Sequence, residues 1–474
     1  MGKEQADMVK INIISNYHDL GSIHCTSYRK NLGMKYALRD KKEMKHSDIE
    51  WVGSIPIGWN SIRLNSLFQH NKKRNDLLEE ENLLSLSYGK IIRKNIDANE
   101  GLLPESFSTY QIVQPGNIVL RLTDLQNDKR SLRVGYVNER GIITSAYIGL
   151  DIIASDQHEG KYFYYLFHAY DLMKVFYNCG AGVRQSLTFN EFKKLNIIAP
   201  TKVEQKHIVD FLDEKTAVID EVMKKKKKQI ELLKEKRAGM ITQAVTKGLN
   251  PNETMVNADV DWIDSISQNH KVLPLKRLVA IKITDGPHTT PQILDEGIPF
   301  LSAQSVQDDG YLDFDQKRGF ISEVDHKMFS KKCRPMKGDI FIVKSGATTG
   351  RVAMVNTDIE FSIWSPLALV RAKTELINPE YLYFFFRSDI FQNQVRVSWS
   401  YGTQENIGMN VLERLQIFFP SIKEQAAIID YLGEKILQID TLIQKIIESI
   451  SLIQEYRSSL ISHAVTGKVS VETS

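Results

Sequence analysis

Clusters of lysine and arginine are the residues of this chain whose types and spacing best suit one chemical task, the binding of phosphate. In the first half the clustered basic residues are Lys90, Arg93, Lys94, Arg121, Lys129, Arg130 and Arg133. In the second half they are Lys331, Lys332, Arg334, Lys337, Lys344 and Arg351. Both types neutralise phosphates, and arginine also reads base edges in the major groove, as asparagine and glutamine do. One such cluster is usually a solvated face, but two on a repeated scaffold favour nucleic-acid binding.

Residue type and loop position together select ten candidate DNA contacts. They are Lys90, Arg93, Lys94, Arg121, Arg130, Arg133, His288, Lys344, Thr348 and Arg351. His288 stands in the segment TDGPHTTP, where its ring could bond a phosphate or a base edge, or could brace a proline-rich turn. Both interpretations of His288 are open at this level.

Signs of catalysis are missing from the chain. A nucleic-acid methyltransferase needs an Asn/Asp-Pro-Pro motif, and the sequence has no Pro-Pro pair. The loop GATTGR at Gly346 lacks the Gly-x-x-x-x-Gly-Lys-Ser/Thr frame of nucleotide hydrolases, so we predict a tight turn between strands there. The histidines and the three cysteines show no zinc-ligand spacing. We therefore expect a non-catalytic chain without a metal or cofactor of its own.

Composition sets broad limits on the protein. With 474 residues the chain can form two to four domains, and a net charge of +3 means that any nucleic-acid surface depends on local clustering. Three distant cysteines, Cys25, Cys179 and Cys333, suggest ordinary thiols in a reducing compartment. No segment reaches the length of about 18 to 20 apolar residues that a membrane helix needs. These features predict a cytoplasmic protein that does not enter a membrane.

The segment from Thr201 to Gly248 occurs twice, and one copy follows each basic cluster. We therefore expect these two segments to position the clusters. At a fixed offset of 220 positions Ser421 begins a second copy, and both copies read as long helices. Thr201 and Ser421 each have a glutamate three residues later, which is the pattern of a capping box. Each copy lacks internal proline and ends at a glycine, Gly248 or Gly467.

Apolar residues at spacings of three, four and seven run along both helices and predict that each packs against the other. Because a long stretch of chain separates the two copies, they can pack antiparallel as a rod of roughly 65 to 70 Å. The run Lys224–Lys228 covers every side of the first helix. We expect at least one of these lysines to approach the seam, with looser packing there.

The segments before the helices predict mixed α/β domains. Each combines short β-rich runs bounded by turn formers with a dense aromatic element, KYFYYLFHAYDLMKVF or EYLYFFFRSDIFQNQV, which we interpret as core. Their openings, from Trp51 and Trp262, agree at an offset of 211. The predicted domains are 1–48 as an N-terminal extension or over-long start, 49–190 as recognition domain 1, 191–250 as helix 1, 251–409 as linker and recognition domain 2, and 410–474 as helix 2 and tail.

These features together resemble the specificity subunit of type I restriction-modification enzymes. The resemblance rests on the opening WVGSIP, on Glu204-Gln205 and Glu424-Gln425, and on the endings Ala244-Val245-Thr246 and Ala464-Val465-Thr466. It implies two mixed α/β target-recognition domains separated by two long antiparallel helices that form a coiled coil, with a pseudo-two-fold internal repeat. Each domain would read one half of a bipartite site in double-stranded DNA.

The resemblance also implies partners. The helices would dock two methyltransferase subunits that carry S-adenosylmethionine, and restriction/translocase subunits would bring ATP and magnesium. Because the two halves differ most between the openings and the helices, we expect unlike half-sites and a non-palindromic target. Two alternatives stay open, namely a self-contained restriction or modification enzyme and a structural adaptor that binds two proteins without DNA.

Overall fold

The chain folds into two compact units, each of which contains half of each long helix. The computed structural model describes residues 37–94, 106–126, 128, 131–153, 155–178, 186–260, 263–398 and 406–471. The first unit comprises the chain up to Lys225 together with Glu448 onward, and the second comprises Lys226–Ile447. The long helices are α5 (Lys202–Lys247) and α10 (Ile422–Val465). Within the described ranges, no helix combines the length and the apolar character that crossing a membrane requires.

Short antiparallel strands build the first unit. Its strands are β1 (Ala37–Leu38), β2 (Met44–His46), β3 (Ser54–Pro56), β4 (Asn60–Arg63), β5 (Phe68–His70), β6 (Leu84–Ser87), β7 (Lys90–Arg93), β8 (Gln111–Val113), β9 (Ile118–Leu120), β10 (Val134–Tyr136), β11 (Gly141–Ile143), β12 (Ile148–Ile152), β13 (Asn196–Ala199) and β25 (Val469–Ser470). One sheet has the order β10-β9-β12-β5, and the pairs β1–β25, β2–β3, β4–β13, β6–β7 and β8–β11 accompany it. Its shorter helices are α3 (Gly160–Leu172) and α4 (Phe189–Phe192).

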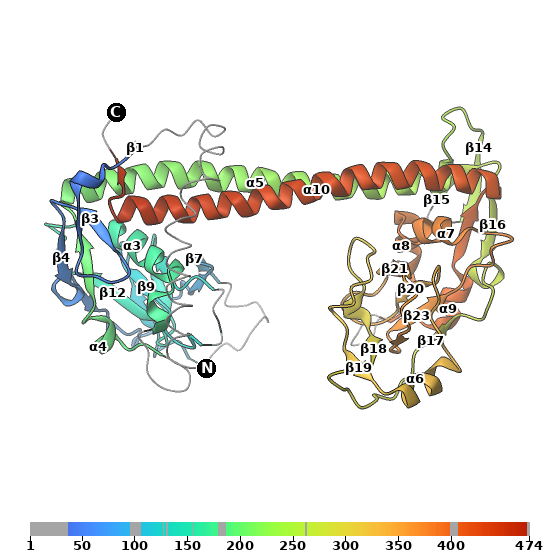
Figure 1. Ribbon diagram of the computed structural model, residues 1–474, viewed down its shortest axis with the longest axis horizontal. Coiled ribbons are helices and arrows are strands. Elements are labelled where there is room, and N and C mark those ends of the chain that lie inside the picture. Colours follow the sequence, from blue (N-terminus) through green and yellow to red (C-terminus); the bar gives the residue numbers. More distant parts are fainter. Residues whose placement is uncertain are drawn as a thin grey trace. The chain divides into compact units, whose positions relative to one another are not determined.

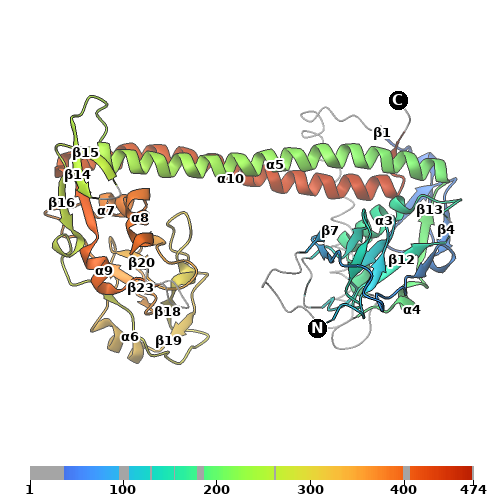
Figure 2. The same ribbon diagram turned by 180° about the vertical axis from the view of Figure 1, so that it is seen from behind.

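Helix α3 is the centre of the first unit's core. It lies between the long helices and strands β9 and β12 (Figures 1 and 2). Phe163, Phe167 and Tyr170 of α3 are fully buried in one cluster with the end of α10. The prediction that this aromatic segment forms core is therefore confirmed.

The second unit repeats this plan with other strands. They are β14 (Met255–Val260), β15 (Ile263–Ser267), β16 (Lys271–Pro274), β17 (Thr284–Asp285), β18 (Ile298–Leu301), β19 (Gly319–Ile321), β20 (Ile340–Val343), β21 (Val352–Met354), β22 (Ser362–Ile363), β23 (Leu367–Val370) and β24 (Gln416–Phe419). The sheets run β17-β23-β20-β21 and β19-β18-β22, with β14–β15 and β16–β24 as pairs. Its shorter helices are α6 (Glu323–Ser330), α7 (Pro379–Phe386), α8 (Asp389–Val397) and α9 (Met409–Arg414).

The second aromatic segment forms two helices, whereas the first forms one. Helix α7 ends at Phe386, and the Ser388 hydroxyl accepts a hydrogen bond from the Phe391 amide (3.3 Å) as the cap of α8. A serine at this position satisfies an orphan amide and so permits a new helix to begin. The buried rings of Phe385 and Phe391 again form core.

The predicted ends of the long helices are confirmed. The Thr201 amide donates to Glu204 Oε2 (3.2 Å) and the Glu204 amide donates to Thr201 Oγ1 (3.3 Å), which completes a capping box. At the second helix the Glu424 amide donates to the Ser421 hydroxyl (3.4 Å). Gly248 and Gly467 adopt φ values of +74° and +70°, in the left-handed region that favours glycine after a helix.

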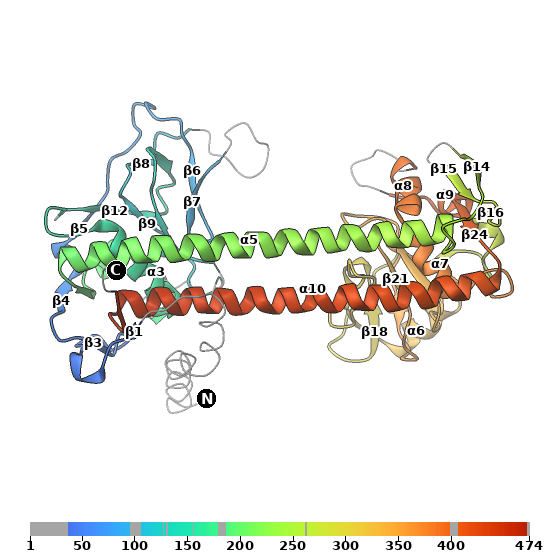
Figure 3. The ribbon, with the colours of Figure 1, turned by 90° about the horizontal axis from the view of Figure 1, so that it is seen from above.

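The long helices pack antiparallel within each unit, as the apolar spacing predicts (Figures 1 and 3). In the first unit the start of α5, with Leu212, shares a core with the end of α10, with Leu460. In the second unit the end of α5, with Val245, shares a core with the start of α10, with Leu432.

The middle of α5 is less buried than its ends. Between Ile219 and Ile241 no apolar side chain of α5 is buried. Lys226 is the half-buried member of the run Lys224–Lys228, and the other four lysines are exposed. This agrees with the prediction that one lysine approaches the seam where packing loosens.

Strands occupy two segments near the edges of the predicted domains. Residues 37–48, assigned to the extension, form β1 and β2, and β2 pairs with β3 so that Met44 opposes Pro56. The segment 255–260, which lies within the predicted linker and recognition domain 2, forms β14, in which Met255 opposes Ser267. Each residue of the first pair lies 211 positions before its counterpart, so the repeat begins earlier than its sequence identity shows. Polar residues on these ladders made both segments resemble loops. Residues 1–36 and Trp262 lie outside the described ranges.

Candidate nucleic-acid interface

The hairpin β6–β7 carries three of the predicted DNA contacts. Lys90, which is 69% exposed, lies 3.4 Å from Asp220 of α5. Arg93 donates through Nε to both carboxylate oxygens of Glu139 (2.8 Å each), and this hydrogen bonding raises the pKa of Arg93. Lys94 is exposed where β7 ends. The hairpin therefore presents three cations, two of them oriented by carboxylates.

Tyr88 at the tip of this hairpin is a residue that the sequence analysis missed. Its φ is +45°, a conformation uncommon for a residue other than glycine, and its side chain is 78% exposed. The next residue, Gly89, also has a positive φ and accepts a hydrogen bond from the Tyr164 hydroxyl (3.4 Å). A strained, exposed aromatic residue beside cations is a candidate for stacking on a base. The dipeptide Tyr-Gly between two β-rich runs was the available signal.

Arg133 is not a surface cation, contrary to its place among the candidate contacts. Its side chain is 0% exposed, and its guanidinium donates to carbonyl oxygens of the segment Arg121–Asp128 and to the Tyr177 hydroxyl (2.9 Å). A guanidinium has five N–H donors, so one buried arginine can satisfy the carbonyls of a whole loop. Arg133 therefore shapes the segment that carries Arg121, which is partly exposed and lies 3.8 Å from Asp128. Arg130 lies outside the described residues.

Asp285 gathers the cations of the second unit. This carboxylate is 8% exposed and accepts from Lys332 Nζ (2.6 Å) and Lys344 Nζ (2.9 Å), and His288 Nε2 lies 3.2 Å from it. Burial acts to raise the pKa of Asp285, but the bonds from the two lysines outweigh it and lower the pKa below its usual value. The candidates Lys344 and His288 thus meet around one anion, an arrangement that no sequence spacing indicated.

The GATTGR segment is the predicted turn between two strands. It joins β20 to β21, which pair antiparallel, and Gly346 and Gly350 both have positive φ values. Thr348 is half-buried in this turn. Arg351 lies apart from the Asp285 group and contacts the Asp308 carboxylate (2.6 Å). The second unit therefore presents His288 and Lys344 around Asp285, Arg351 beside Asp308, and Thr348 in the turn between β20 and β21.

Matching contacts fasten each recognition domain to the long helices. The Tyr162 hydroxyl donates to the Val465 carbonyl (2.9 Å) in the first unit, and in the second the Tyr381 hydroxyl lies within hydrogen-bond distance of the carbonyls of Val245 (3.2 Å) and Phe418 (2.9 Å). Helices α3 and α7 are therefore attached to the long helices in the same way, although the loops around them differ between the two units.

Ion pairs between the helices also repeat. Asp220 accepts from Arg457 (3.0 Å) in the first unit, and Asp440 accepts from Arg237 in the second. Both acids and both arginines occupy equivalent positions at the offset of 220. The repeat was visible in the sequence, but the pairing of each acid with the arginine of the other copy was not.

Across the described ranges, no three His, Cys, Asp or Glu side chains come together in a way that could hold a metal ion. The described surfaces of both units carry lysine, arginine, histidine and tyrosine side chains that can form ionic and hydrogen-bonded contacts.

Comparison with known proteins identifies similar sequences. The chain matches the family model described as the type I restriction modification DNA specificity domain twice, over residues 56–232 and 272–452. It is 21% identical over 332 residues to the type I restriction enzyme EcoBI specificity subunit of Escherichia coli, covering 68% of each chain. It is also 21% identical over 431 residues to the MjaVIII specificity subunit of Methanocaldococcus jannaschii, covering 88% of this chain and 94% of that one.

A solved structure shares the fold. Its description is the structural basis underlying complex assembly and conformational transition of the type I R-M system. The TM-score is 0.63 at 15% sequence identity, covering 87% of this chain and 99% of the other. At this identity the likeness supports the architecture of mixed α/β domains on long helices.

Proposed function

The chain belongs to the family of type I restriction-modification specificity subunits, and from this premise we propose that it reads a bipartite, non-palindromic site in double-stranded DNA. The observation that carries the proposal is that two unlike basic surfaces stand on two like frames. The frames repeat the tyrosine–carbonyl bond to the long helices. The surfaces are the β6–β7 hairpin in one unit and the Asp285 and Asp308 groups in the other. Unlike surfaces favour unlike half-sites.

The proposed contacts fall into two classes. Exposed lysines such as Lys90 and Lys94 would neutralise phosphates, which sets affinity and register without sequence information. Arg93 and Arg351, each paired with a carboxylate, would read base edges, as would Thr348 and His288. Arg133 acts indirectly by shaping the segment that holds Arg121.

The long helices would set the distance between the half-sites. Helices of 46 and 44 residues limit the rod to roughly 65 to 70 Å at about 1.5 Å per residue. At about 3.4 Å per base pair, half-site centres could then lie no more than roughly 20 base pairs apart.

We further propose that the outer faces of α5 and α10 dock two methyltransferase subunits, to which restriction/translocase subunits add. Large apolar side chains are exposed on these helices although their inner faces are already buried, among them Val203, Leu232 and Leu437. A docked subunit would cover these side chains, and contiguous apolar surface of this kind marks protein-binding sites. S-adenosylmethionine, ATP and magnesium would be bound by the partners, and the assembly would act on DNA in the cytoplasm.

Methylome sequencing of cells that carry this chain with its methyltransferase subunit tests the proposal. We expect one methylated motif with two different specified halves and a fixed unspecified gap. A palindromic or continuous motif would contradict the proposal.

Two biochemical assays test the alternatives, a self-contained enzyme and an adaptor that does not contact DNA. The purified chain alone, given DNA, S-adenosylmethionine, magnesium and ATP, should neither methylate nor cleave, and either activity would identify a self-contained enzyme. The complex with methyltransferase subunits should bind a duplex carrying the mapped motif in a salt-dependent way. No binding would identify an adaptor that does not contact DNA.

A further inference from the structure

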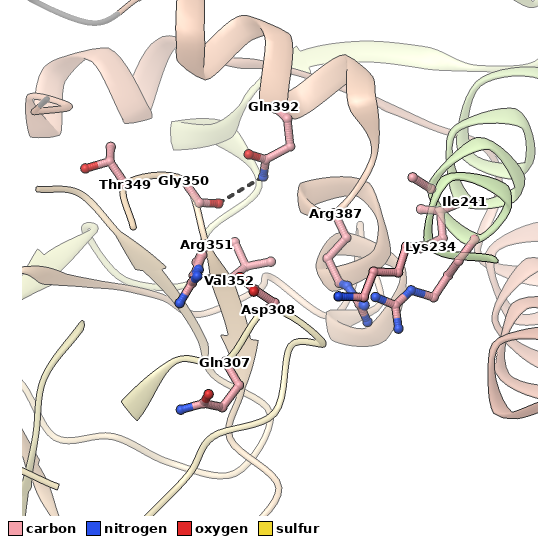
Figure 4. A pocket seen from close by; sticks show the side chains of 12 residues that line it. Lys234, Ile241, Gln307, Asp308, Thr349, Gly350, Arg351, Val352, Arg387 and Gln392 are labelled. Atoms are coloured by element: carbon pink, nitrogen blue, oxygen red, sulfur yellow. Dashed lines mark hydrogen bonds and ion pairs between the residues drawn. The ribbon is translucent and has the colours of Figure 1, made fainter. Parts of the chain in front are cut away.

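A cationic pocket lies in the second unit, where α5 faces the recognition domain. Its volume is about 250 Å³, and its charged and amide lining includes Lys234, Arg237, Asp308, Arg351, Arg387 and Gln392. Figure 4 shows Lys234 of α5 and Arg387 at the end of α7 extending toward each other, while Gln392 bonds the Gly350 carbonyl (2.9 Å). Side chains from α5, from the GATTGR turn and from the α7–α8 junction thus converge on one space.

The positive charge of this pocket is only partly neutralised. Arg237 is paired with Asp440, and Arg351 with Asp308. Arg387 instead donates to the Tyr383 hydroxyl (2.8 Å), a neutral group. No ion pair of Lys234 or Arg387 is found within the described residues. The pocket therefore holds more cationic than anionic groups. Lys234 and Arg387 are the cations for which no carboxylate partner is found among the described residues.

Among the described residues of the first unit, neutral side chains occupy the positions that correspond to Lys234 and Arg387, although the surrounding frame is the same. Tyr164 and Tyr383 occupy matching places, since each donates through its hydroxyl to a glycine carbonyl in a neighbouring loop (3.4 and 3.3 Å). His168 is the sixth residue after Tyr162, as Arg387 is after Tyr381. Burial, followed by the charge of Arg457, lowers the pKa of His168 to about 4, so this side chain is neutral near pH 7.

Lys234, like Arg387, corresponds to a neutral residue in the first unit. The residue that corresponds to Lys234 at the offset of 220 is Gln454, which is neutral. The ion pair itself is common to both units, as Asp220–Arg457 and Arg237–Asp440. Lys234 and Arg387 are thus additions specific to the second unit, and the frame does not require them.

We propose that this pocket binds a phosphate group through Lys234 and Arg387. Its volume suffices for one phosphate with ordered water, and lysine and arginine supply the point charge and the planar donor fork that phosphate accepts. The phosphate would come from the backbone of bound DNA beside the second half-site, an assignment that rests on the proposed function. A free nucleotide or pyrophosphate offers the same chemistry.

The test uses the complex of this chain with its methyltransferase subunits and a fluorescent duplex that carries the mapped motif. The variant Lys234→Gln with Arg387→Gln is compared with Lys236→Gln with Arg396→Gln. The control removes the same charge from exposed positions outside the pocket lining. DNA affinity is measured against salt concentration, and thermal melting confirms that both variants fold.

Each phosphate contact contributes about 0.9 to the slope of log affinity against log salt. We expect the pocket variant to reduce this slope by roughly 1 and to weaken binding roughly three- to tenfold at physiological salt, equally for specific and unrelated DNA. The control variant should change the slope less. The variant Lys234→Arg with Arg387→Lys keeps both charges, so it should preserve most of the wild-type slope.

A second arm titrates pyrophosphate and ATP calorimetrically into the same complexes without DNA. If the pocket variant keeps the DNA slope but loses pyrophosphate binding that the wild type shows, the pocket holds a phosphate from a small molecule. If it changes neither, the proposal is wrong. If the wild-type complex binds no DNA at all, the proposed function fails, and the pyrophosphate arm still decides whether the pocket binds phosphate.

Discussion

Asp285 illustrates how one side chain can organise a basic surface. Its nearly buried carboxylate holds Lys332 and Lys344 at hydrogen-bond distance and draws in His288. Lys344 is only 12% exposed, so its ammonium depends on this partner more than a surface lysine would. Arg133 acts in a comparable way on the Arg121–Asp128 segment, by satisfying carbonyls. At the residue scale, the carboxylates and carbonyls bonded to each cation determine where its charge lies.

Replacement of Asp285 by Asn should destabilise the second unit by about 1 to 3 kcal/mol, because Lys344 then lacks its counter-charge. DNA affinity should fall as well, since Lys332, Lys344 and His288 lose their common anchor. Urea unfolding and anisotropy measure the two effects, with the exposed Asp295→Asn as the control.

This effect should depend on pH. The folded pKa of Asp285 is lowered, so the stabilisation is present above the unfolded pKa, about 3.9, and is lost as pH falls through the folded pKa. The stability difference between wild type and Asp285→Asn should thus be full at pH 7 and shrink below about pH 4. A difference independent of pH would contradict the ion-pair explanation.

Tyr88 provides a second prediction at the residue scale. Asparagine tolerates positive φ better than tyrosine does, so Tyr88→Asn should leave stability unchanged or raise it by a few tenths of a kcal/mol. The same substitution should weaken DNA binding at least about threefold if the ring stacks on a base. Equal DNA affinity would show that the exposed ring has no part in binding.

At the scale of elements, α5 and α10 combine an apolar seam with two symmetric ion pairs. The arginines are mostly buried, and the pairs join residues 237 and 203 positions apart in sequence. Apolar contacts supply most of the attraction between such helices, whereas partly buried charges favour one register over its alternatives.

A double-mutant cycle with Arg237→Met and Asp440→Asn should reveal a coupling energy of about 0.5 to 2 kcal/mol in chemical unfolding. Each single substitution should cost more than the second one does in the presence of the first, because it leaves one charge without its partner. The cycle with Lys206→Met and Asp210→Asn, an exposed pair within α5, is the control and should show about 0.5 kcal/mol or less. Comparable coupling in both cycles would mean that the inter-helix pair has no special role.

At the scale of the whole molecule, the repeat gives one chain two recognition domains built on the same frame. The same tyrosine bond, helix cap and ion pair recur, while the hairpin, the Asp285 group and the phosphate pocket belong to one unit each. A frame of this kind allows each domain to change without altering the other, which would suit the proposed recognition of two unlike half-sites.

Deletion of residues 222–228 from α5 together with 449–455 from α10 tests the ruler. Seven residues span about 10.5 Å and preserve the heptad seam, so the unspecified gap in the methylated motif should shorten by roughly three base pairs. Replacement of Lys224–Lys228 by glutamine should leave the gap unchanged. Methylome sequencing reads both results, and an unchanged gap after the deletion would refute the ruler.

Local signals in the sequence determined the long helices and the turns of this protein. Thr201 with Glu204 marks a helix start, Gly248 and Gly467 mark helix ends, and the glycines of GATTGR mark a turn, because each acts on backbone groups within a few residues. Periodic apolar residues likewise showed which faces are buried. Family resemblance then extended these elements to a two-reader architecture.

Tertiary structure alone decided the roles of individual charges. Arg133 and Arg93 both read as surface cations, yet Arg133 is buried among carbonyls, whereas Arg93 lies on the surface and bonds Glu139. Strand β2 was hidden for a different reason, since its polar residues resemble a loop although its partner β3 lies nearby in the sequence. Pairing across long stretches of sequence depends on how the whole chain closes, and side-chain type records no partner. Whether a cation contacts solvent, a carboxylate or a backbone loop is therefore a property of the fold.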